Sequence, residues 1–98
     1  MARWVVLVGR SQRDHHDVDE VAHFEGTREE ARARLYEIAC THRPGVGLRQ
    51  KRRQVYRIGD GDAYYANIEG VMATFRVVYR LGELEWSTHP ESWPWAWK

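Results

Sequence analysis

Two hydrophobic periods follow each other along this chain, and the change from one to the other fixes most of its architecture. Between residues 27 and 42, apolar side chains recur every three to four positions, as they do on one face of a helix. Between residues 53 and 81, they alternate with polar side chains at a period of two, as in strands that bury a single face. This succession predicts an antiparallel sheet with the helix packed on one of its faces.

The predicted helix has a clear beginning and a clear end. Thr27 and Glu30 are spaced as a capping box, in which each side chain accepts a hydrogen bond from the backbone amide of the other. Pro44 and Gly45 end the helix, and Arg43 places a cation near the negative end of its dipole. One stripe is expected to face the sheet. It consists of Ala31, Leu35, Ile38, Ala39 and His42.

Five strands are predicted around this helix. Apolar or alternating stretches place them at residues 4–8, 21–26, 53–58, 64–68 and 73–81. Short turns join the last three strands into a meander, and the polar stretch at 11–19 predicts an exposed loop between the first two. The fold class is therefore α+β in the order β-β-α-β-β-β, with an antiparallel sheet of four to five strands and one amphipathic helix on one face.

Length and composition bound the class of protein. The 98 residues suffice for one domain, expected over residues 1–88, followed by a Trp- and Pro-rich tail at 89–98. A net charge of +1 excludes a protein that is basic overall, so any nucleic-acid role needs charge gathered on one face. Cys40 is the single cysteine, and no apolar run has the length of a membrane span or a signal peptide. We therefore expect a cytoplasmic protein with no membrane association.

Positive charge is concentrated in one segment. Residues 43–57 carry six basic side chains and no acid, whereas the whole chain has fifteen basic and fourteen acidic side chains. In the last strand, Phe75, Val77 and Tyr79 are expected to face the core, which turns the arginines at positions 76 and 80 away from the helix. The sheet face opposite the helix is therefore expected to be basic.

The strand at 53–58 is expected to extend this basic surface. If Tyr56 and Ile58 face the core, the arginines at positions 53 and 57 join the outer face. Guanidinium groups beside small apolar patches can bind phosphates while bases lie on the sheet. The alternative is that these arginines only make an uncovered face soluble. The candidate nucleic-acid or anion-binding residues are Arg49, Lys51, Arg52, Arg53, Arg57, Arg76 and Arg80.

The tail provides a second candidate surface. In an extended chain, Trp93, Trp95 and Trp97 present one aromatic side, and Pro94 stiffens the backbone between them. Exposed indoles promote aggregation, so they are expected to pack on the sheet of this domain, on a second copy or on another protein. The alternative function is therefore protein interaction or homodimerisation through the sheet face, an edge strand or this tail.

Catalytic and metal-binding chemistry is not predicted. The His- and Asp-rich stretch at 14–23 lacks the spacing of a calcium loop and the cysteines of a zinc knuckle. Cys40 and His42 are two positions apart on the predicted helix, where side chains diverge, so they do not form a nucleophile pair. We therefore expect a non-catalytic binding domain without cofactor or metal, whose partner is either a nucleic acid or a protein.

Overall fold

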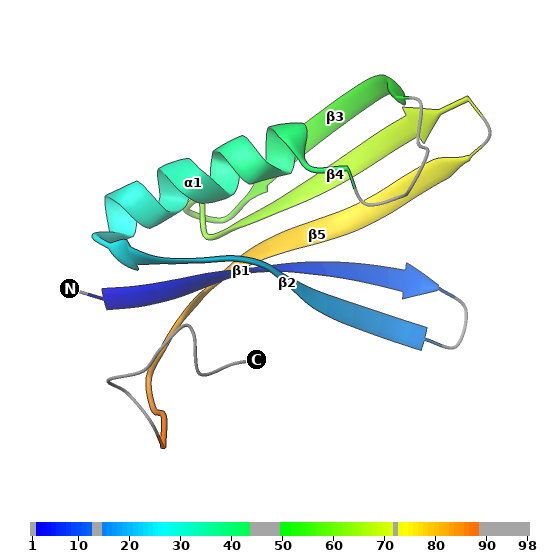
Figure 1. The fold of residues 1–98 in the computed structure, drawn as a ribbon. Coiled ribbons are helices and arrows are strands. Elements are labelled where there is room, and N and C mark those ends of the chain that lie inside the picture. The colour runs from blue at the N-terminus through cyan, green and yellow to red at the C-terminus, as the bar shows by residue number, and fades with distance from the viewer. Residues whose placement is uncertain (1, 13–14, 44–49, 72, 89–98) are drawn as a thin grey trace.

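The computed structural model describes residues 2–12, 15–43, 50–71 and 73–88, which form one antiparallel sheet and one helix (Figure 1). The strand order within the sheet is β2-β1-β5-β4-β3, and α1 lies across one face of it. We call this the helix face, and the opposite one the open face. The predicted class and element order are confirmed. The elements are β1 (Ala2–Gln12), β2 (His15–Gly26), α1 (Arg28–Thr41), β3 (Gln50–Ile58), β4 (Ala63–Gly70) and β5 (Thr74–Glu83).

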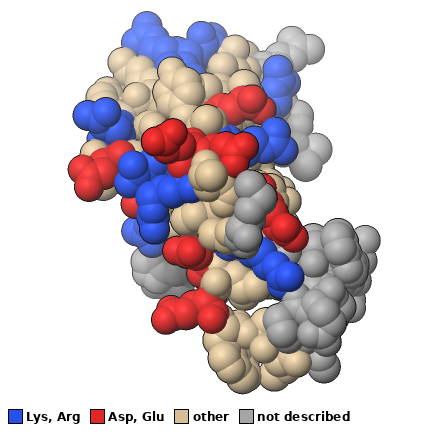
Figure 2. Space-filling view, turned by 90° about the vertical axis from the view of Figure 1, so that its left-hand side faces the viewer, with Lys and Arg blue, Asp and Glu red and all other residues tan. Residues whose placement is uncertain are grey.

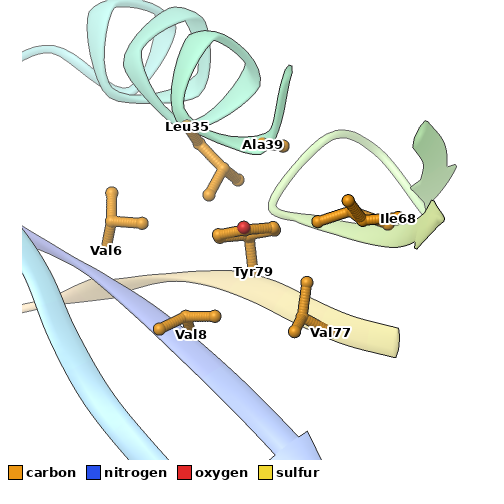
Figure 3. Close-up of a cluster of buried hydrophobic side chains, with 8 residues drawn as sticks. Val6, Val8, Leu35, Ala39, Ile68, Val77 and Tyr79 are labelled. Atoms are coloured by element: carbon orange, nitrogen blue, oxygen red, sulfur yellow. The ribbon is translucent and has the colours of Figure 1, made fainter. Parts of the chain in front are cut away.

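The core lies between α1 and the helix face (Figure 3). Leu35 is fully buried in the middle of α1, and Ala31 and Ala39 lie one turn to either side of it, also buried. Beneath them, alternate residues of the central strands are buried, as the period of two predicts. These strand residues are Trp4, Val6 and Val8 of β1, Ala66 and Ile68 of β4, and Val77 and Tyr79 of β5.

The capping box at the start of α1 is confirmed. The Glu30 amide donates to the Thr27 hydroxyl at 3.2 Å, and the Thr27 amide donates to the Glu30 carboxylate at 2.8 Å. Two of the first backbone donors of the helix are thereby satisfied, which fixes the residue at which the helix begins.

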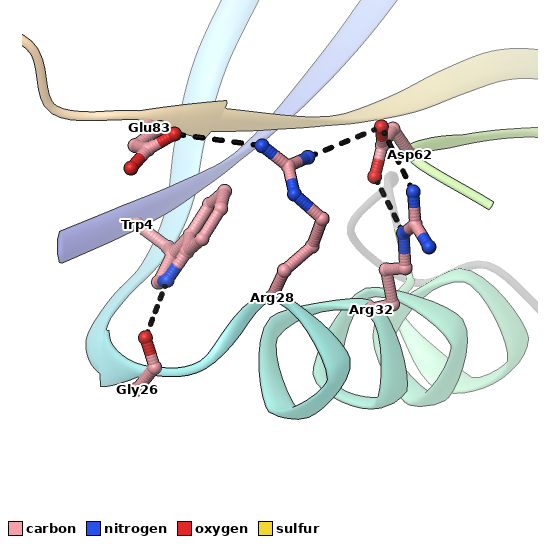
Figure 4. A network of polar contacts seen from close by, with 6 residues as sticks. All are labelled: Trp4, Gly26, Arg28, Arg32, Asp62 and Glu83. Atoms are coloured by element: carbon pink, nitrogen blue, oxygen red, sulfur yellow. Dashed lines mark hydrogen bonds and ion pairs between the residues drawn. The ribbon is translucent and has the colours of Figure 1, made fainter. Parts of the chain in front are cut away.

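Ion pairs clamp the first turns of α1 onto the sheet (Figure 4). The Arg32 Nε donates to a carboxylate oxygen of Asp62 at 2.9 Å, and Arg28 lies between Asp62 at 3.4 Å and Glu83 at 3.5 Å. The Arg32 guanidinium is the main cause that holds the pKa of Asp62 below its usual value. The Arg28 guanidinium also lies 5.1 Å from the centre of the Trp4 ring. The acid in the turn before β4 therefore positions the helix.

The molecule is seen from this end of the helix in Figure 2, where basic and acidic side chains lie next to one another. The two charge signs alternate here because Arg28 and Arg32 of the helix each form an ion pair with an acid of the sheet or of its turns. This end of the molecule is therefore not the basic surface that the sequence predicts.

The predicted loop at 11–19 is wrong. β1 and β2 continue as an antiparallel pair to Gln12 and His15, whereas β1 pairs with β5 only between Trp4 and Arg10. The far end of this hairpin is thus a two-stranded ribbon, in which β1 and β2 pair with each other but no longer with β5. A backbone ladder needs no apolar side chains, so polar residues form it as readily as a loop, and the hydrophobic pattern carries no signal for it.

Candidate functional site

The strand register divides the predicted arginines between the two faces of the sheet. Arg76 and Arg80 alternate with the buried residues of β5, so they lie exposed on the open face as predicted. Arg53 pairs with Ile68 of β4, which is fully buried under the helix. Because directly paired residues share a face, Arg53 lies on the helix face, and so does Arg57, four residues along. The prediction that all four share the open face is wrong.

The position of Arg53 has a physical cause at the end of α1. Its Nη1 donates to the carbonyl of Ala39 at 2.8 Å, and its Nη2 donates to the carbonyl of His42. Its Nε donates to the side chain of Gln50 at 2.8 Å. The last turn of α1 has no basic residue of its own, so a cation from β3 satisfies its free carbonyls and the negative end of its dipole. Arg53, rather than Arg43, thus caps this end of the helix.

Because β3 faces the opposite way from the prediction, its apolar residues Tyr56 and Ile58 lie on the open face. Tyr56 is 52% exposed and Ile58 is 47% exposed, although both were predicted to face the core. The ring of Tyr56 stacks on the ring of Tyr65 in β4, with their centres 5.9 Å apart and their planes at 29°. Tyr65 in turn pairs with Val78 of β5. The open face therefore carries an aromatic and aliphatic row across three neighbouring strands.

Arginines lie on both sides of this row. Arg80 and Arg76 lie two residues to either side of Val78 along β5, and neither forms an ion pair with another described residue. Beside Arg76, the register sets Asn67 of β4 and Gln54 of β3, which add amide groups to the face. We call the central part of this face the tyrosine–arginine surface. It consists of Tyr56, Tyr65, Arg76, Val78 and Arg80.

The other predicted site residues lie apart from this surface or outside the described chain. Arg52 lies on the open face near the start of β3, where its Nη1 is 3.7 Å from a carboxylate oxygen of Glu69. Lys51 and Arg57 are exposed on β3, one of the two edge strands of the described sheet. Arg49 and the tail tryptophans Trp93, Trp95 and Trp97 lie outside the described residues.

A polar cluster that the sequence did not predict lies at the end of α1. The Nδ1 of His42 is 2.9 Å from the hydroxyl of Tyr79, and the two rings meet edge to face with their centres 5.5 Å apart. Burial lowers the pKa of His42, as do the positive charges of Arg53 and Arg10, while Asp19 opposes them. The imidazole is therefore neutral at pH 7 and serves as the hydrogen-bond partner of a buried phenol.

This cluster predicts a pH dependence of stability. The pKa of His42 lies below 6.5 in the folded protein and returns to about 6.5 in the unfolded chain. Between these two pKa values, the unfolded chain therefore binds more protons than the folded protein does. The free energy of unfolding falls as the pH decreases below about 6.5. His42→Gln removes the titration, so the stability difference between wild type and variant should shrink at acid pH. Urea unfolding at neutral and acid pH measures this difference, and a difference independent of pH would contradict the prediction.

Two further properties follow from the described part of the chain. No group of three or more His, Cys, Asp or Glu residues within it is placed to hold a metal ion. Its one helix, α1, is neither long enough nor apolar enough to cross a membrane. Cys40 is half-buried on that helix, next to Tyr36, and the contact raises the pKa of the tyrosine.

Comparison with known proteins gives no family for this chain. No family model matches the sequence, and no curated protein or solved structure matches it. Function must therefore be inferred from the chemistry of the surface itself.

Proposed function

We propose that this protein binds single-stranded nucleic acid at the tyrosine–arginine surface. The observation that carries the proposal is the stack of the exposed Tyr56 on the half-buried Tyr65, next to two arginines without an acidic partner among the described residues. Aromatic rings on a sheet stack with bases of any sequence, at about 1–3 kcal/mol for each base. Guanidinium groups beside them bind the phosphates that connect those bases.

The geometry favours single strands over duplexes. Bases in a duplex already stack on one another and present only their edges, whereas unpaired bases can lie flat on a tyrosine ring. In the described part of the chain the ring of Tyr56 is exposed on the open face, so it can meet such bases without a groove. Two rings offer stacking for about two bases, so we expect weak binding with little sequence preference.

The charge on this face also supports the proposal. Arg76 stands beside the uncharged side chains of Asn67 and Gln54. Arg80 pairs with Ala63 of β4 and Leu7 of β1. Acids lie further out on this face, with Glu69 near Arg52 at the far end of β4 and Glu20 on the edge strand β2. The centre of the face is therefore positive, although the net charge of the whole chain is only +1. A nearly neutral chain can bind nucleic acid only where its positive charge is concentrated on one face, and the centre of this face has such a concentration.

Fluorescence anisotropy with labelled oligothymidine and oligouridine at low salt tests the proposal. Replacing both Arg76 and Arg80 with glutamate should weaken binding roughly tenfold or more. It should also flatten the slope of affinity against salt by about 0.7 for each phosphate that the variant no longer neutralises. Tyr56→Ala should weaken binding with an unchanged salt slope, because stacking releases no counterions.

A matched control separates the surface from total charge. The double substitution of Arg34 and Arg43 with glutamate makes the same change in net charge at exposed positions on and after α1, and it should leave the affinity nearly unchanged. An equal loss in both double variants would show that binding is unspecific. No binding of either oligonucleotide by the wild type would refute the proposal.

Self-association through the same face is the competing outcome. Ile58 lies exposed beside the tyrosine stack, and apolar side chains of this kind are common where two copies meet. Light scattering decides between the two: a dimer that Ile58→Lys converts to a monomer would assign the face to homodimerisation. A monomer that binds oligonucleotides would support the proposed function.

A further inference from the structure

The outer edge of β3 is unpaired in the described part of the chain. β3 is the last strand in the sheet order, and among the described strands it pairs only with β4. Its pairing with β4 runs without interruption from Arg52 to Ile58, after a register shift near its first residue. Between described residues, no backbone hydrogen bond outside this ladder involves the strand. A straight edge with free donors and acceptors can accept a further strand.

The charge on this edge restricts what can pair with it. The strand contains four basic residues and no acidic one. Arg53 is engaged with the end of α1 and Arg52 lies near Glu69, but Lys51 and Arg57 are exposed and form no ion pair with any described residue. Two copies paired edge to edge through β3 would place like charges opposite each other. The same cations would attract an acidic strand.

The edge strand on the other side of the sheet, β2, is not a suitable partner for β3 of a second copy of this chain. β2 carries acidic residues, but its pairing with β1 shifts register between Val6 and Leu7, which marks a bulge in the ladder. A bulge bends a strand and interrupts the straight row of donors and acceptors that a partner strand needs. The acidic strand is therefore expected from a different protein.

We propose that β3 accepts an extended acidic segment of another protein as a sixth strand of this sheet. Along such a segment, side chains alternate between the faces. Carboxylates on the helix face would lie near Arg57, and apolar side chains on the open face would lie near Tyr56 and Ile58. The segment recognised is therefore one that alternates acidic with apolar residues. Its site adjoins the tyrosine–arginine surface at Tyr56, whereas Arg76 and Arg80 lie two strands away on β5.

Fluorescence anisotropy with the full chain and a labelled Glu-Val repeat peptide tests this proposal. The wild type should bind this peptide and should not bind the corresponding Lys-Val peptide. Replacing both Lys51 and Arg57 with glutamate should reverse that preference, with a change of at least roughly tenfold for each peptide. Circular dichroism confirms that the variant is folded. A variant that keeps its affinity for the Glu-Val peptide would show that this edge is not the site.

Backbone methylation of the peptide separates strand pairing from charge attraction. In an added strand, only every second residue directs its amide towards β3. We therefore compare two peptides, one N-methylated at the odd residues and the other at the even residues. Methylation of the amides that face β3 should abolish binding, and methylation of the other set should leave it unchanged. Equal binding of both frames would overturn the proposal, because charge alone would explain the association. The double substitution of Arg76 and Arg80 with glutamate should leave peptide binding within about twofold, so failure here is distinguishable from failure of the proposed nucleic-acid function.

Discussion

Replacing Leu35 with alanine is expected to lower the free energy of unfolding by about 3–5 kcal/mol, a large part of the stability of a domain of this size. Leu35 is fully buried, and its fully buried neighbours on α1, Ala31 and Ala39, are small. Its side chain therefore supplies much of the apolar contact that holds the helix against the sheet. Urea unfolding followed by circular dichroism measures the loss directly.

The control for this substitution is on the same helix. Tyr36 is large but 55% exposed, so Tyr36→Ala removes even more atoms without opening a cavity in the core. Its expected cost is about 1 kcal/mol or less. Similar losses in the two variants would mean that α1 is not anchored through Leu35.

Arg53→Met is expected to cost about 2–3 kcal/mol, which is unusual for a strand residue close to the surface. The substitution keeps an apolar stem but removes the guanidinium that binds the carbonyls of Ala39 and His42. Hydrogen bonds from a charged donor contribute about 1.5–3 kcal/mol, and half-buried acceptors left without a donor add to the loss. Unfolding curves of the variant and the wild type give the difference.

Arg57→Met is the matched control, because Arg57 lies on the same strand and face but is exposed. Its expected effect is within about 0.5 kcal/mol. Hydrogen exchange adds a local readout: the His42 amide, which donates to the Ile38 carbonyl at 2.8 Å, should lose protection in the Arg53 variant alone. Equal effects of the two substitutions would rule out the capping role.

The helix and β5 could be predicted from the sequence because one clear local pattern marks each of them. The capping box at Thr27 and the helical stripe around Leu35 predicted the helix, and the alternation around Val77 predicted β5 and the facing of Arg76 and Arg80. Each of these signals is local, and no distant residue competes with it. The binding role of the two arginines is not established by their facing and stays a prediction.

The facing of β3 could not be predicted because apolar residues occupy both of its faces. Val55 lies on one face and Tyr56 and Ile58 on the other, so alternation alone permits either orientation. The orientation of β3 is set by Arg53, whose guanidinium reaches the end of a helix more than ten residues away in the sequence. Such a contact exists only after the tertiary fold has formed. The Tyr56–Tyr65 stack depends on the same orientation.

The position of β5 has a consequence for the order in which the molecule can assemble. Of the five strands that the structure describes, it is the last along the sequence, yet it lies in the middle of the sheet, between β1 and β4. A nascent chain that ends before Thr74 can form the β1–β2 hairpin and the β3–β4 hairpin, but no strand joins them. Both hairpins then present inner edges that β5 later covers. Until β5 is available, the two hairpins therefore expose edges that no other described strand covers, and association with other chains is favoured most at that stage of folding.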